Sequence, residues 1–184
     1  MNNPEYILVD EIGVLAQKAS TNLIADAVLT TAINYQYGYL HELKTKLQQA
    51  STMQAFAALK YPLLWLVQPF SIKRVNGNYF GDTQVRFFII QQSQATLFAE
   101  ERMAISFKPV LYPVYREMIK QFNNASHLFE GTMNAAQSHT ITDRYYWGEN
   151  QQEQIDDIFD CMEISGLDLQ ISNNPNCTIP TTFF

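Results

Sequence analysis

The chain has 184 residues, of which 47% are apolar and 16% are charged, and its formal net charge is −6. This length and apolar content are enough to bury one hydrophobic core, so the composition excludes a disordered protein. The N-terminus lacks the basic-then-apolar order of a signal peptide, and no stretch reaches the roughly 18 to 20 apolar residues of a membrane span. We therefore expect a protein that is made in the cytosol and does not insert into a membrane.

Charge is distributed unevenly along the chain. Residues 60–120 hold eight Lys or Arg against four Asp or Glu, whereas residues 143–168 hold eight acids and a single base, Arg144. Two interpretations stay open. The two regions could be differently solvated faces of one subunit, or the acidic surface of one subunit could meet the basic surface of the next. The chain has 16 Gln and 13 Asn. This high amide content indicates either a simple compositional bias or a neutral surface suited to repeated contacts.

Three elements are predicted in the first part of the chain. Residues 4–25 carry apolar side chains at helical spacing and predict mainly helix. Residues 28–38 alternate β-branched and aromatic side chains, which predicts a strand that stops at Gly38. Leucines spaced three and four residues apart predict a short helix over residues 39–51.

A strand that is buried on both faces is predicted next. The run KYPLLWLVQPF, residues 60–70, is continuously apolar, which indicates a central position in the sheet. Pro62 and Pro69 should mark where its pairing stops, because proline has no backbone donor. Residues 84–93 predict a second apolar strand that forms a hairpin with the first. Two turn signals lie between these strands, Asn76-Gly77 and Gly81-Asp82.

The stretch ERMAISFKPVLYPVYREMIKQF, residues 101–122, predicts an amphipathic helix that contains two prolines. A proline in a helix interior removes a donor and costs about 3 kcal/mol. Pro109 and Pro113 are four residues apart and so lie on one side of the helix, where they should bend or break it. We expect Pro113 to open a second helical segment, because a missing donor costs little in a first turn.

Two more strands are predicted after a loop of small and amide residues over 123–137. They cover residues 139–148 and 159–172, and the second contains a bulge at Gly166.

This order of elements predicts an α+β fold with a small mixed or antiparallel sheet and helices packed mainly on one face. We expect one domain over residues 1–172, followed by an irregular tail over residues 173–184.

No set of residues dictates a reaction. The sequence has no nucleophile with an adjacent base, no phosphate-binding loop and no metal-ligand cluster at the spacings that these chemistries require. The histidines are scattered, and no supporting motif accompanies a pairing of Cys161 with His139. We expect Cys161 and Cys177 to stay reduced, and we expect no enzyme activity, no cofactor and no bound metal.

Several residues are candidates for contact with other proteins. Three aspartates of the segment QEQIDDIFDCME lack the alternating ligands and central glycine of a calcium loop, so they favour a solvated acidic face. Basic and aromatic residues near the predicted hairpin favour protein contact over nucleic acid, because the chain is acidic. The tail is expected to dock on a neighbouring subunit through two phenylalanines. The candidate interface residues are Lys73, Arg74, Tyr79, Phe80, Asp156, Asp157, Asp160, Phe183 and Phe184.

Four segments carry a resemblance to a known group of proteins. They are NYQYGYLHELKTKLQQAS, KYPLLWLVQPF, EERMAISFKPVLYPVYREMIKQF and IDDIFDCMEISGLDLQIS, which lie within residues 30–172. In these segments the chain resembles small proteins of tailed bacteriophages and prophages of Bacteroides-type bacteria. More broadly, it is similar to the tail-terminator and head-to-tail connector proteins, whose fold would be tail-terminator-like.

The resemblance implies a structural virion protein without catalytic residues, assembled in the cytoplasm of the bacterial host. Its subunits would form a cyclic homo-oligomer of six or twelve copies where the phage tail joins the head. Other neck, portal or tail proteins would be its partners. The resemblance implies no membrane contact and no sequence-specific nucleic-acid binding, although DNA could pass through the ring channel. A small hydrolase or ligand-binding α+β domain and a phage-encoded host-directed adaptor stay open as alternatives.

Overall fold

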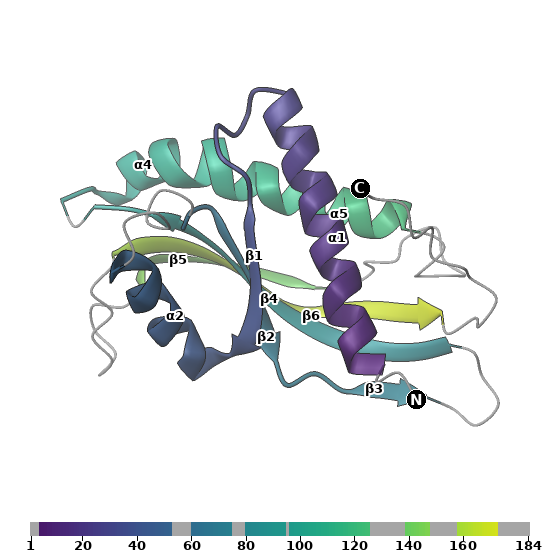
Figure 1. Cartoon of the computed structure of the whole chain (residues 1–184). Coiled ribbons are helices and arrows are strands. Elements are labelled where there is room, and N and C mark those ends of the chain that lie inside the picture. Colours follow the sequence, from purple (N-terminus) through teal and green to yellow (C-terminus); the bar gives the residue numbers. More distant parts are fainter. Residues whose placement is uncertain are drawn as a thin grey trace.

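The computed structural model describes residues 4–52, 60–74, 80–94, 96–125, 139–147 and 158–172. They form an open, six-stranded mixed sheet with helices packed against it (Figure 1), which confirms the predicted α+β fold. The predicted tail lies outside these residues. In chain order the elements are α1 (Pro4–Ala25), β1 (Asn34–Tyr39), α2 (Leu40–Thr52), β2 (Leu63–Gln68), β3 (Ile72–Arg74), β4 (Phe80–Gln92), α4 (Ala99–Arg102), the π-helix η1 (Met103–Leu111), α5 (Tyr112–Asn124), β5 (Thr140–Trp147) and β6 (Phe159–Ser172).

The strands lie in the order β1-β2-β4-β6-β5, and β3 pairs with the first residues of β4. β1 and β2 are parallel, and the other pairs are antiparallel. β2 therefore lies inside the sheet, and β2 and β4 pair as the predicted hairpin requires. Pro62 and Pro69 directly flank β2, so its ladder ends at residues that have no backbone donor, as expected.

Each face of the sheet is buried against helices, and alternate residues of β2 belong to different cores. Leu64 and Leu66 belong to the larger core, together with residues of α1, η1 and α5. Leu63 and Trp65 belong to a smaller core with residues of α2. We call these two sides of the sheet the major face and the minor face. The helices pack mainly on the major face, as predicted.

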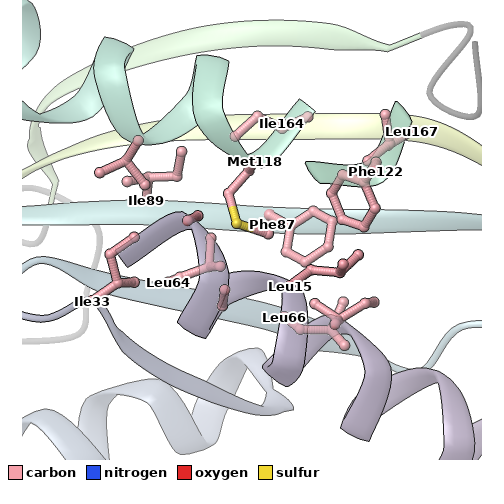
Figure 2. Close-up of a cluster of buried hydrophobic side chains, with 14 of the residues drawn as sticks. Leu15, Ile33, Leu64, Leu66, Phe87, Ile89, Met118, Phe122, Ile164 and Leu167 are labelled. Carbon is pink, nitrogen blue, oxygen red and sulfur yellow. The ribbon is translucent and has the colours of Figure 1, made fainter. Parts of the chain in front are cut away.

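The larger core joins α1, the strands and α5 (Figure 2). Phe87 of β4 and Phe122 of α5 pack with their ring centroids 5.8 Å apart. Leu15 of α1 and Leu167 of β6 are each no more than 2% exposed. Full burial of one such side chain contributes about 1.5 to 3 kcal/mol, so this core is a main source of stability.

The predicted proline-containing helix is present and runs through α4, η1 and α5 without interruption (Figure 1). Arg102 and Leu111, which precede the two junctions, keep right-handed helical dihedral angles. A break is therefore excluded, and the helix instead widens into a π-helix that contains Pro109. Pro113 lies in the first turn of α5, as predicted.

The π-helix is compatible with Pro109, the proline that it contains. The Tyr112 N–H donates to the carbonyl of Phe107, five residues back. In an α-helix a proline ring clashes with the carbonyl four residues back. The wider turn of a π-helix relieves this clash, so a π-helix suits a segment that contains Pro109.

Gly166 forms the bulge that the sequence predicted in β6. The register of β6 against β4 shifts here, so that Ser165 and Gly166 lie opposite the single residue Arg86. Gly166 has a φ of +66°, which glycine adopts at little cost. Because of the extra residue, Ile164 and Leu167 both face the larger core although they are three residues apart.

The boundaries of β1 differ from the prediction. The strand begins at Asn34 rather than at Val28, because the chain first turns after α1 and the Val28 N–H donates to the Leu23 carbonyl. β1 also continues through Gly38 instead of stopping there. A side chain at Gly38 would place its Cβ only 3.0 Å from the Trp65 ring, so this glycine provides room for the indole.

One of the two predicted turns is wrong. Gly81 and Asp82 lie inside β4, where they pair with β3 on one side and β6 on the other. Pairing on both sides overrides the local turn preference of the Gly-Asp sequence. The other turn signal, Asn76-Gly77, lies outside the described residues.

Candidate functional site

Part of the minor face forms an open groove with a volume of about 530 Å³. Its lining combines the polar side chains of Gln84, Arg86 and Glu163 with the apolar side chains of Leu40 and Val67. Strands β2, β4 and β6 supply most of this lining, and Leu40 is the first residue of α2. We call this feature the open groove.

Three neighbouring strands each place one charged residue of an ion-pair cluster on the minor face, and two of these residues, Arg86 and Glu163, line the groove. Glu163 of β6 lies between Arg86 of β4 and Arg144 of β5. Nε and Nη2 of Arg86 lie 2.7 and 2.5 Å from Oε1 of Glu163. Nε and Nη2 of Arg144 both lie 2.5 Å from Oε2. Each oxygen of one carboxylate is therefore held by a different arginine.

Burial and charge are unequal within this group. The Glu163 side chain is 7% exposed, whereas the side chains of Arg86 and Arg144 are 40% and 39% exposed. A buried carboxylate needs a partner to offset its loss of hydration, and one arginine would neutralise it. The second arginine gives these three side chains a summed charge of +1, and the exposed Asp168 carboxylate, which accepts a hydrogen bond from the groove-lining Gln84 at 3.0 Å, offsets it.

The Arg86 side chain also contacts a buried aromatic ring. Its guanidinium carbon lies 4.9 Å from the ring centroid of Phe88, which is fully buried in the smaller core. Such a cation–π contact adds attraction between the guanidinium and the ring. Arg86 is therefore bound to a carboxylate and also lies over an aromatic ring.

The bulge in β6 helps to create this arrangement. Arg86 lies opposite Ser165 and Gly166, so the strand carries one extra residue beside the arginine. Bulges commonly change the direction of side chains near binding sites. Here the bulge lets Glu163 stay on the minor face while the following leucines return to the major face.

The site is suited to binding an anion rather than to transferring a proton. Both oxygens of Glu163 already accept from arginines. Arginine itself stays protonated and offers a planar set of donors that matches a carboxylate or phosphate. Among the residues that the structure describes, no group of three or more His, Cys, Asp or Glu side chains could hold a metal ion.

The predicted basic and aromatic interface residues are only partly described. Lys73 is exposed on β3 and pairs with Asp82 of β4. Arg74 and Phe80 lie in paired strands. Tyr79 lies outside the described residues. The remaining candidates Asp156, Asp157, Phe183 and Phe184 also lie outside them.

Asp160 does not belong to a solvated acidic face, and that expectation is wrong for this residue. Its side chain is fully buried, with Oδ1 2.6 Å from Nη1 of Arg102, whose side chain is 1% exposed. Asp160 pairs across strands with Gln91 in β4 and faces the underside of the long helix. A buried carboxylate requires such a partner.

Charges that seem segregated along the chain are paired within the fold. Arg86 and Arg102 come from the basic region of the sequence, and Glu163 and Asp160, which they contact, come from the acidic region. Part of the charge asymmetry is therefore compensated inside one subunit. The second arginine that contacts Glu163 is Arg144, the single base of the acidic region.

Cys161 and His139 do not form a pair. Cys161 lies in the smaller core on the minor face, where burial raises the pKa of its thiol. His139 precedes β5, and its Nε2 lies 2.7 Å from the Tyr115 hydroxyl of α5 on the major face. The sheet separates the two side chains.

No helix among the described residues is long and apolar enough to cross a membrane. Comparison of the sequence with models of known protein families, and with curated proteins, gave no match.

Proposed function

We propose that the chain is a structural subunit of a phage neck or tail, and that it docks on neighbouring subunits through the open groove. The proposal follows from the resemblance in sequence and is supported by the groove itself. The observation that carries it is a pair of arginines, Arg86 and Arg144, whose side chains are 40% and 39% exposed and which one buried carboxylate holds on the minor face. Opposite potentials orient a contact between two different patches.

Contacts between different patches close into rings when the rotation between subunits is a simple fraction of a turn. The groove lies on one face of an open sheet, so a neighbour that fills it must present some other surface. A head-to-tail ring of six or twelve copies is the arrangement that we propose, with portal or tail proteins above and below. Its place would be the virion, after assembly in the host cytoplasm, and its role would be non-catalytic.

The edge of β1 is less suited than the groove to such a contact. The Tyr39 N–H donates to Oε2 of Glu42 at 2.9 Å, and Lys46 Nζ donates to the Tyr37 carbonyl at 3.3 Å. Side chains of α2 thus already satisfy edge groups that another strand would need. We therefore assign the contact to the face of the sheet.

A ligand-binding domain is the second candidate function. A volume of about 530 Å³ lies within the range of small-molecule sites, and the groove combines apolar and polar walls. This candidate predicts tight binding of a small anion by the free subunit without any assembly.

Electron microscopy of the chain mixed with portal and tail proteins tests the leading proposal. We expect a ring in which one subunit contacts the next through unlike surfaces. A two-fold dimer as the sole form in the assembled particle would contradict the proposal. Charge reversal by Arg144→Glu should reduce incorporation into particles, whereas Arg116→Glu, on the exposed surface of α5, should not.

A further inference from the structure

We propose that the outer face of the long helix, over residues 98–109, binds the same face of a second copy of this chain in an antiparallel, two-fold contact. This surface is separate from the open groove. The inference therefore goes beyond the proposed ring, does not depend on it, and is compatible with it.

The outer face carries apolar side chains that the subunit itself leaves in solvent. Phe98 is 78% exposed and Ile105 is 57% exposed, which makes them the two most exposed large apolar side chains that the structure describes. Pro109, four residues after Ile105, is exposed as well. Residues at these spacings lie on one side of a helix. Covering them would remove apolar surface from water, which favours association.

A charged ridge runs beside these apolar side chains. Glu100, Ala104 and Lys108 are exposed and are spaced four residues apart, so they follow one ridge of the helix surface. The ridge begins with an acid and ends with a base, and its middle residue is small. Among the described residues, neither Glu100 nor Lys108 has an ion-pair partner.

This order of charges makes the ridge complementary to itself. A two-fold axis between two antiparallel helices brings the same ridge of each copy together in reverse order. With the axis beside Ala104, Glu100 of each copy lies opposite Lys108 of the other, because each is four residues from Ala104. A parallel pair would place like charges opposite one another, so the pattern selects the antiparallel arrangement.

The rest of the subunit leaves this part of the helix open. α1 packs against α5, which is the other half of the long helix (Figure 1). The opposite side of α4 and η1 faces the sheet through Arg102, Ser106 and Phe107, which are all buried. A second copy can therefore reach the ridge without any change in the fold.

Disulfide trapping in the full-length chain with Cys177→Ser tests the position of the axis, since the remaining Cys161 is buried. A cysteine at Ala104→Cys would meet its own counterpart, so diamide should convert most of this variant into a covalent dimer. The control is Arg116→Cys, an exposed position about 18 Å further along the helix. Its two counterparts would lie about 36 Å apart, far beyond the reach of a disulfide. Equal trapping of both variants, or of neither, would overturn the inference.

Charge reversal tests the pairing of the ridge. Lys108→Glu and Glu100→Lys should each raise the dissociation constant of the dimer, measured by sedimentation, by roughly ten-fold, because like charges would then meet. The double variant with both changes restores the two ion pairs and should return to within roughly three-fold of the unaltered chain. Arg116→Glu lies outside the contact and should change nothing.

Two results would contradict this pairing. One is a double variant that dimerises as weakly as the single variants, and the other is an Arg116→Glu variant as weak as Lys108→Glu. Circular dichroism confirms that each variant is folded. All of these changes leave the open groove unaltered, so a failure here would not count against the proposed ring.

Discussion

Arg102 and Asp160 form a buried ion pair, with Nη1 and Oδ1 2.6 Å apart. The same guanidinium donates to the carbonyls of Leu97 and Gln94 and to the Ser93 hydroxyl. One arginine thus ties the start of the long helix to β6 and to the connection that follows β4. The pair anchors the helix above the sheet.

Removing either partner should be costly. Arg102→Met leaves a buried carboxylate without its cation, and we expect a loss of about 3 to 5 kcal/mol in the free energy of unfolding. Urea denaturation followed by circular dichroism measures it, with Arg116→Met as the exposed control. The double variant Arg102→Met with Asp160→Leu should lose less than the sum of the single losses. Additive losses would show that the pair is not coupled.

Acid should weaken the contact between α1 and α5 through Glu117. This carboxylate accepts from Asn22 Nδ2 at 2.6 Å and from Gln121 Nε2 at 2.7 Å. Burial, the largest single influence, raises its pKa. The hydrogen bonds from Asn22, Gln121 and Lys120, together with the Lys120 charge, outweigh burial, so the pKa lies below the ordinary 4.5.

A folded-state pKa below the unfolded one means that this stabilisation is complete above the ordinary pKa and is lost as the pH falls below it. Urea denaturation at a series of pH values should therefore show a steeper loss for the unaltered chain than for Glu117→Gln in that range. The same slope for both proteins would show that Glu117 does not contribute to the acid sensitivity.

Two glycines should respond differently to alanine. Gly166→Ala forces a left-handed conformation on alanine, and its Cβ would meet only the Gln84 side chain at 3.7 Å, so about 1 to 2 kcal/mol should be lost. Gly38→Ala adds a collision with the Trp65 ring at 3.0 Å and with the Glu42 carboxylate. Chemical denaturation should rank Gly38→Ala as the more damaging change. The reverse order would contradict this packing at β1.

Pro113→Ala should leave the fold intact. Pro113 lies in the first turn of α5 in a helix that continues from η1, and alanine adopts the same helical dihedral angles, so the change should be within about 1 kcal/mol. If the shape of the long helix matters for docking, ring formation will fall while the thermal midpoint stays nearly constant. A large drop in the midpoint would show that Pro113 supports the core itself.

Local patterns predicted most of the elements, because spacing along the chain reports which side chains face a core. The continuous run in β2 and the bulge at Gly166 are examples. The same reasoning could have predicted the burial of Asp160. In β6, Asp160, Met162 and Ile164 are two residues apart and therefore lie on the same face of the strand. Met162 and Ile164 face the larger core, so Asp160 is expected to be buried as well.

The cluster of Arg86, Arg144 and Glu163 on the minor face could not be predicted in the same way. Arg86, Arg144 and Glu163 come from three strands, and they meet only because β6 lies between β4 and β5. Sequence spacing does not determine strand order. The available signal was that charged residues lie inside these strands, and their spacing indicates the face that each occupies but not its neighbours on other strands.

The central claim is that the open groove is covered when subunits assemble. In a chain with Cys177→Ser, a cysteine at Ser165→Cys would lie in the groove, and one at Lys18→Cys would lie on the exposed surface of α1. Thiol labelling of free subunits and of assembled particles compares their accessibility. The account predicts that assembly protects position 165 strongly and position 18 little. Equal labelling of position 165 in both states would contradict it.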